Sequence, residues 1–139
     1  MSNAAIVYPV FAHVALVFVL MVVMFNRRVA AIKARELTLR DAMFPARAFP
    51  ERATLAANAY QNQFEMPLLF YAAVLFAIAL NGVNTALVVL AWAYVAARAV
   101  HALLHVNGAN ALKRMRPFAV SALILLAMWV LLALHLALR

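Results

Sequence analysis

Residues 58–70 read NAYQNQFEMPLLF and continue without interruption into the apolar run YAAVLFAIAL at residues 71–80. The first half carries two asparagines, a glutamate and a proline, whereas the second half is apolar enough to continue a membrane-spanning helix. Ionisable side chains at bilayer depth are costly unless they face a cavity, another polar group or a ligand. The stretch therefore predicts a spanning helix whose first half lines a polar seam open to the cytoplasm and whose second half completes the crossing.

The composition of the whole chain indicates an integral membrane protein. Of its 139 residues, 70% are hydrophobic and 12% are charged, and the mean hydropathy of +0.97 is far above that of a typical soluble domain. The length allows about four spanning helices of roughly 20 residues each, which excludes a separate soluble domain. The chain has no cysteine, so it has neither a thiolate metal site nor a cysteine nucleophile of its own.

The apolar runs predict an all-α, up-down-up-down bundle of four helices in one domain over residues 1–139. The expected spans are about residues 6–25, 51–80, 85–106 and 117–138. Pro45 and Pro50 interrupt the first connection, NGVN at 81–84 predicts a tight turn, and Pro117 is suited to open the fourth helix. No basic segment precedes the first apolar run, so we expect that run to remain as a helix.

Basic residues account for the net charge of +8 and gather in two of the three connections. Between the first and second spans lie Arg27, Arg28, Lys33, Arg35, Arg40, Arg47 and Arg52. Between the third and fourth spans lie Lys113, Arg114 and Arg116. The positive-inside rule places both connections in the cytoplasm and both termini outside. These charges are expected to face membrane lipids and solvent, and no nucleic-acid partner is predicted.

The helical pattern of the first span continues through residues 27–37 as an extension into water.

Two polar stripes are predicted on the second and third spans. One stripe consists of Asn58, Asn62 and Glu65, spaced four and three residues apart. The other consists of Arg98, His101 and His105, spaced three and four residues apart, so each stripe follows one helical face. At 1.5 Å of rise per residue from the shared turn, Glu65 lies about 24 Å and Arg98 about 21 Å along their helices. We expect these two side chains to face each other, water or a ligand, with Asn62 beside His101 and Asn58 beside His105.

Pro67 predicts a kink next to this polar stripe. Proline has no N–H to donate to the carbonyl of Gln63, which leaves an unpaired backbone acceptor close to Glu65.

A simpler interpretation of the two polar stripes is that their contacts only hold the helices together. The lone histidines His13 and His135 are expected to snorkel or to bond to neighbouring backbone rather than to form a site.

Two other functions fit parts of the pattern. His101 and His105 could ligate a metal ion from one helical face with Glu65 as a third ligand, but the neighbouring Arg98 disfavours a cation, so no metal site is predicted. Ionisable residues at membrane depth are also typical of a pathway for protons or small solutes. The chain offers only one kinked span and no further charged stripe for such a pathway.

The order of these features resembles the MAPEG family, the membrane-associated proteins in eicosanoid and glutathione metabolism, which includes microsomal glutathione transferases. The resemblance covers nearly the whole chain: four spans, a basic first connection, and a second helix that opens ERATLAANAYQNQFEMP. Its most specific part is Asn62-Gln-Phe-Glu65 followed by Pro67, which looks like the family's Asn-x-x-Glu-and-proline element.

This resemblance implies a homotrimer that binds glutathione, as a co-substrate, between neighbouring subunits near the cytoplasmic side. Asn62 and Glu65 match the family's glutathione contacts, with Glu65 suited to the ammonium group of the peptide. Arg98 matches a conserved arginine position of the third helix. His101 and His105 replace tyrosines that many members carry.

The basic residues have expected roles in the same site. Asn58 stands where active members often carry an arginine. Arg52, near the membrane surface, is suited to a carboxylate of glutathione. The position of the family's thiolate-stabilising arginine falls in the second basic connection, where Lys113, Arg114 and Arg116 are all candidates and no spacing selects one; Arg114 and Arg116 are the predicted catalytic residues.

The function implied by the resemblance is a glutathione-dependent transferase or peroxidase that acts on apolar electrophiles or lipid hydroperoxides at the cytoplasmic side of the bilayer. A cation beside the sulfur would lower the pKa of the glutathione thiol and raise the fraction of reactive thiolate. The alternative is a noncatalytic lipid-binding or ligand-binding membrane scaffold of the same fold. The sequence does not decide whether the chain is an enzyme.

Overall fold

The structure is a computed structural model that describes residues 3–44 and 49–138, so Pro45 and Arg47 lie outside the described residues. Its long helices are α1 (Ala4–Lys33), α3 (Glu51–Gln61), α4 (Met66–Ala79), α5 (Thr85–Val106) and α6 (Ala111–Ala137). Short 3₁₀ turns cover Asp41–Met43 and Asn62–Phe64, and no strand occurs in these ranges. Counting Glu51–Ala79 as one crossing, four helices of the described chain are long and apolar enough to span a membrane. The predicted all-α architecture is confirmed.

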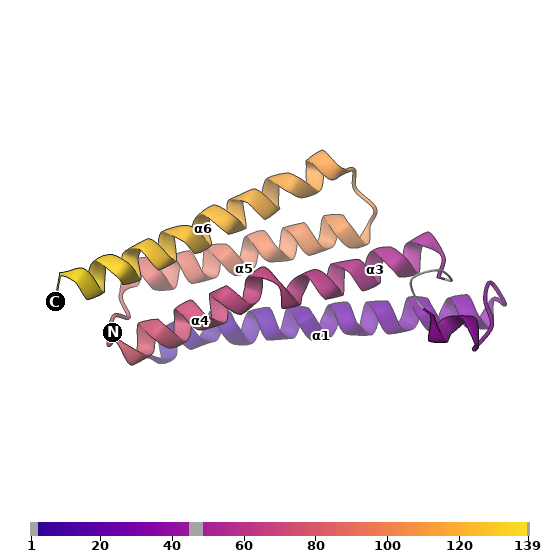
Figure 1. The fold of residues 1–139 in the computed structure, drawn as a ribbon, viewed down its shortest axis with the longest axis horizontal. Helices are drawn as coiled ribbons and strands as arrows, with labels where there is room; N and C mark the ends of the chain where they lie inside the picture. The colour runs from indigo at the N-terminus through magenta and orange to yellow at the C-terminus, as the bar shows by residue number, and fades with distance from the viewer. Residues whose placement is uncertain (1–2, 45–48, 139) are drawn as a thin grey trace.

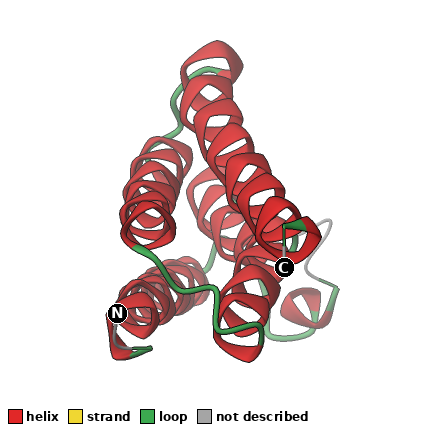
Figure 2. Cartoon of the chain, turned by 90° about the vertical axis from the view of Figure 1, so that its left-hand side faces the viewer, coloured by secondary structure: helices red, strands yellow, loops and turns green. Residues whose placement is uncertain are grey.

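The helices run side by side along the long axis of the molecule and reverse direction at each connection (Figure 1). The start of α1 and the end of α6 therefore lie at the same end of the bundle. Figure 2 looks along the bundle and shows the helices arranged around a common interior. Helix α5 packs along α6 near the 81–84 turn, whereas the beginning of α6 splays away from α3 at the opposite end (Figure 1).

The second crossing is broken rather than continuous over residues 51–80. Helix α3 ends at Gln61, the 3₁₀ turn follows, and Glu65 has φ −94° and ψ −94° before α4 begins. Pro67 lies in the first turn of α4, where its missing N–H costs no helical hydrogen bond. The kink predicted from this proline is present, and it takes the form of a complete interruption (Figure 1).

Asparagine caps set the beginnings of the last two helices. Asn84 Oδ1 accepts from Leu87 N at 3.0 Å, and α5 has the bounds expected from the sequence. Helix α6 begins at Ala111, earlier than the expected start at Pro117, because Asn110 Oδ1 accepts from Lys113 N at 2.9 Å and caps the helix there. Pro117 lies inside α6. This additional N-terminal segment places Lys113, Arg114 and Arg116 on the first turns of α6.

Arginine side chains link the helices at the end of the bundle that carries both basic connections. Arg27 Nη1 donates to Arg52 O at 3.0 Å and to Val106 O at 2.9 Å, which links α1 to α3 and to the end of α5. Arg52 Nη2 in turn forms a salt bridge with Glu36 Oε1 at 3.2 Å. Helix α1 continues beyond its apolar run to Lys33, so the predicted extension over residues 27–37 is confirmed up to Lys33 and the chain turns after it.

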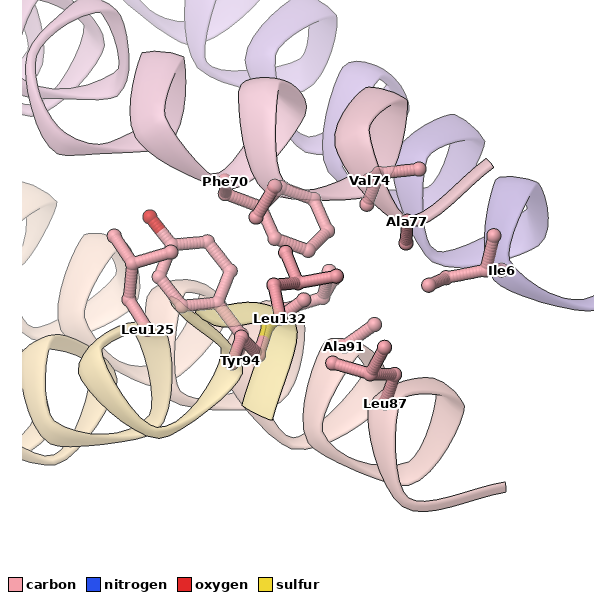
Figure 3. Close-up of a cluster of buried hydrophobic side chains, with 12 residues drawn as sticks. Ile6, Phe70, Val74, Ala77, Leu87, Ala91, Tyr94, Leu125 and Leu132 are labelled. Atoms are coloured by element: carbon pink, nitrogen blue, oxygen red, sulfur yellow. The ribbon is translucent and has the colours of Figure 1, made fainter. Parts of the chain in front are cut away.

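The apolar core lies in the half of the bundle near the 81–84 turn (Figure 3). The ring of Phe70 stacks on that of Tyr94, with centroids 4.5 Å apart and planes inclined by 19°. Further core residues drawn in Figure 3 are Ile6, Val74, Ala77, Leu87, Ala91, Leu125 and Leu132. Large apolar side chains such as Phe18, Leu75 and Leu123 face outward, as expected of a lipid-exposed surface. A smaller apolar cluster of Leu20, Ala59 and Ala102 continues into the other half of the bundle, where buried polar side chains also occur.

Candidate functional site

A pocket of about 220 Å³ opens where α6 splays away from α3. Its wall consists of Asn62, His101, His105, Ala111, Arg114, Met115 and Phe118. The structure thus brings together four of the residues predicted from sequence, contributed by three helical segments. Asn62 comes from the 3₁₀ turn after α3, the two histidines from the last turns of α5, and Arg114 from the first turn of α6.

Arg98 fixes the conformation of Asn62 from behind this pocket. The Arg98 side chain is fully buried, and its Nη2 donates to Asn62 Oδ1 at 2.6 Å and to Asn62 O at 3.0 Å. The same nitrogen contacts Gln63 Oε1 at 3.1 Å. Because Oδ1 of Asn62 accepts from Arg98, the amide Nδ2 is the donor left to interact with a ligand. Arg98 therefore supports the pocket without lining it.

A backbone carbonyl determines the tautomer of His101. Nδ1 of His101 lies 3.0 Å from Arg114 O, and since a carbonyl oxygen only accepts, Nδ1 carries the hydrogen. In the neutral ring Nε2 then keeps its lone pair, and this atom is buried without a partner among the described residues. The ring of His105 lies 5.7 Å from that of His101 at 75°.

The pocket contains further polar atoms that lack partners. Nδ1 of His105 and Nε of Arg114 are buried and have no hydrogen-bond partner in the described chain. Buried polar atoms are normally paired, so unpaired atoms around one cavity indicate a ligand or ordered water there. The wall offers the Asn62 amide as a donor, the His101 Nε2 lone pair as an acceptor and the Arg114 guanidinium as a cation. These groups suit a polar ligand that carries negative charge.

Glu65 and Arg98 are turned toward different surroundings. The Glu65 side chain is exposed, Arg98 is buried, and the two form no salt bridge in the described chain. The 3₁₀ turn winds more tightly than an α-helix, so it rotates the residues after Asn62 relative to the expected face. As a result, Gln63 rather than Glu65 contacts Arg98.

Three other predicted residues lie outside this pocket. Asn58 lines a separate cavity of about 530 Å³ between α1 and α3, which it shares with Arg28, so the structure does not place it in the pocket of His105. Arg52 is engaged in its salt bridge at the end of the bundle. Arg116 is exposed and does not line the pocket, in contrast to Arg114.

Sequence reasoning missed several residues that shape these cavities. Gln63 is buried and also donates from Nε2 to Ala59 O at 3.0 Å, although its only signal in the sequence was its place between Asn62 and Glu65. The guanidinium of Arg28 lies over the Phe49 ring at 4.9 Å from the centroid, which only the fold reveals. His13 is expected from the sequence to snorkel or to bond to neighbouring backbone, but its Nδ1 lies 2.6 Å from the side-chain hydroxyl of Tyr71.

The bundle of four spans agrees with a comparison against protein families. The family model of the MAPEG family matches residues 6–134. The chain belongs to the MAPEG family. No curated protein and no solved structure matches it in the corresponding comparisons. MAPEG proteins are membrane four-helix bundles, and membership supports, in general terms, a role in membrane glutathione or eicosanoid metabolism. The matched range includes every residue of the pocket wall and the Arg98 that supports it.

Proposed function

We propose that this MAPEG protein is a membrane-embedded, glutathione-dependent transferase or peroxidase that acts on apolar electrophiles or lipid hydroperoxides. The observation that carries this proposal is the pocket in which His101, His105 and Arg114 present unpaired polar atoms beside the amide of Asn62. Glutathione is an anionic peptide with a thiol, and MAPEG proteins in general use it as a substrate. The donors and the cation of the pocket fit such a ligand.

Arg114 is assigned the catalytic role that the sequence left open between Arg114 and Arg116. A guanidinium in a partly dry site remains protonated and favours the thiolate over the thiol. The lone pair of His101 Nε2 is suited to accept the thiol proton. In the transferase reaction the thiolate sulfur forms a bond to the electrophilic carbon, and the leaving group departs with the electron pair of its own bond.

The size of the pocket supports assembly with further copies of the chain. Its volume of about 220 Å³ is below the roughly 300–1,000 Å³ of complete small-molecule sites. A homotrimer, general in the family, would supply the rest of the wall from a neighbouring subunit. The exposed Glu65 then lies at that boundary and is available to the ammonium group of glutathione.

Charge distribution supports the orientation of the site. The pocket lies at the end of the bundle that carries Arg27, Arg52 and Lys113. By the positive-inside rule this end faces the cytoplasm and both termini face outward. Water-soluble glutathione would enter from the cytoplasm, and the apolar second substrate would arrive through the bilayer.

Thermal unfolding and turnover of the purified protein test this proposal. Glutathione is expected to raise the melting temperature in detergent, and chlorodinitrobenzene to be conjugated with release of chloride. Arg114→Gln should lower kcat about 100-fold, as loss of one charge-stabilising donor does in other enzymes. Arg116→Gln is the matched control, because Arg116 is exposed outside the pocket, and it should retain activity within about twofold. Equal losses in the two variants, or no effect of glutathione on stability, would contradict the proposal.

A noncatalytic lipid-binding role is the second candidate, and a specific groove favours it. An apolar groove of about 320 Å³ runs between α1 and the α3–α4 break and opens on the outer surface of the bundle. Its wall consists of Val14, Val17, Phe18, Met21, Tyr60, Gln63, Phe64 and Tyr71. An acyl chain fits such a lining. Stabilisation by glutathione without turnover of either an electrophile or a hydroperoxide would favour this role.

A further inference from the structure

A second group of polar side chains lies inside the bundle, apart from the pocket wall. His13 of α1 and Tyr94 and Arg98 of α5 are all fully buried, and we call these three residues the buried donor cluster. Tyr94 and Arg98 are one helical turn apart on the same face of α5. The rings of His13 and Tyr94 have centroids 6.3 Å apart. Gln63, which contacts Arg98, also lies beside His13.

Each member of the buried donor cluster has polar atoms without a partner in the described chain. These atoms are His13 Nε2, the Tyr94 hydroxyl, Arg98 Nε and Arg98 Nη1. All hydrogen bonds of the Arg98 guanidinium are made through its other terminal nitrogen, Nη2. Arginine nitrogens only donate, and the tyrosine hydroxyl has its proton available.

The tautomer of His13 makes its unpaired nitrogen a donor as well. The Tyr71 hydroxyl lies 2.6 Å from His13 Nδ1. Gln63, the polar neighbour of Tyr71 in the apolar groove, already uses its amide for Ala59 O and Arg98. The Tyr71 proton therefore goes to Nδ1, and the hydrogen of the neutral His13 ring is on Nε2. The cluster thus contains several buried N–H and O–H groups without an acceptor and carries one full positive charge.

No acidic side chain of the described residues lies within salt-bridge distance of this charge, and the exposed Glu65 attracts it only from farther away. Arg98 bonds only to neutral amide and carbonyl oxygens, and Arg52–Glu36 is the salt bridge found in the described residues. A buried charge is costly unless it is paired with an opposite one. A water molecule would accept from only some of the donors, would need acceptors for its own two protons, and would leave the charge unbalanced. A small anion satisfies several donors and balances the charge.

We propose that the buried donor cluster binds one small monovalent anion, such as chloride, between α1 and α5 at the level of the 3₁₀ turn. The anion accepts from Arg98 Nε and Nη1, from Tyr94 and from His13 Nε2. Its position leaves Nη2 of Arg98 free to hold Asn62. Anion binding in the interior therefore stabilises the same arginine conformation that shapes the pocket.

Thermal unfolding of the full-length protein in detergent, without glutathione, tests this site. Sodium chloride and sodium gluconate are compared at the same ionic strength and pH. Chloride at about 100 times its Kd is expected to raise the melting temperature by about 9 °C over gluconate. Crystals grown in sodium bromide should show an anomalous peak within hydrogen-bonding distance of Arg98 Nη1. Equal melting temperatures in the two salts, or no bromide peak, would overturn the proposal.

Matched tyrosine variants connect the salt effect to the cluster. Tyr94→Phe removes one donor with little change in shape and is expected to lose at least half of the chloride shift. In gluconate the same variant should be at least as stable as the original protein, because an unpaired buried hydroxyl is gone. Tyr8→Phe is the control, since Tyr8 is 61% exposed far from the cluster, and it should keep the full shift.

The variant results decide between a specific site and a general salt effect. A full chloride shift in Tyr94→Phe, or a reduced one in Tyr8→Phe, would contradict the proposal. Arg98→Met should abolish the chloride-dependent shift in melting temperature. If the Arg98→Met protein does not fold, the Tyr94→Phe result decides the question. Because glutathione is absent from every sample, failure here leaves the proposed transferase function untouched.

Discussion

Replacing Asn62 by alanine is expected to reduce the free energy of unfolding by about 1–2 kcal/mol. The substitution removes the 2.6 Å hydrogen bond between Arg98 Nη2 and Asn62 Oδ1. A hydrogen bond to a charged group contributes about 1.5–3 kcal/mol in water-soluble proteins, and competing partners in a membrane lower that value. Arg98 is not left without partners, because Asn62 O and Gln63 Oε1 still accept from the same nitrogen. The loss is therefore that of one bond rather than of a buried charge.

The assay is unfolding by titration of SDS into detergent micelles, followed by the fluorescence of Trp92 and Trp129. Asn58→Ala is the matched control: Asn58 lies one turn earlier, is exposed, and should change stability by less than about 0.5 kcal/mol. In an Arg98→Met background the cost of Asn62→Ala should nearly disappear, because the two side chains no longer interact. This account of the 3₁₀ turn would be refuted if Asn62→Ala and Asn58→Ala lowered the free energy of unfolding equally. It would also be refuted if Asn62→Ala cost as much in the Arg98→Met protein as in the original protein.

Two further predictions concern other buried hydrogen bonds. Tyr71→Phe removes the hydroxyl 2.6 Å from the buried His13 Nδ1 and should cost about 1 kcal/mol in the same titration. Adding His13→Phe should recover part of that loss of stability, because the unpaired acceptor His13 Nδ1 is then removed as well. A larger loss in the double variant would contradict the assignment of Tyr71 as the donor to His13 Nδ1. Asn84→Ala removes the cap bonded to Leu87 N and should also cost about 1 kcal/mol. Unchanged stability would show that the cap does not hold α5.

Local chemistry explains which parts of the fold the sequence predicted. Helix length and hydropathy are properties of contiguous residues, so four spans could be recognised from the apolar runs. The interruption near Pro67 follows from the missing N–H of proline, which acts within one turn of the helix. The beginning of α6 was placed too late, because the cap at Asn110 was not recognised beside the stronger signal of Pro117.

The membrane location, the number of spans, the position of the kink and the polar residues available to a site could therefore be predicted from the amino-acid sequence. Tertiary structure decided which of these residues meet. The 3₁₀ turn rotates the chain so that Gln63 and Asn62, rather than Glu65, contact Arg98. The packing of α6 brings Arg114 to the histidines of α5 and leaves Arg116 outside. Rotation about a helix axis depends on contacts between distant segments, so spacing along one helix cannot fix it.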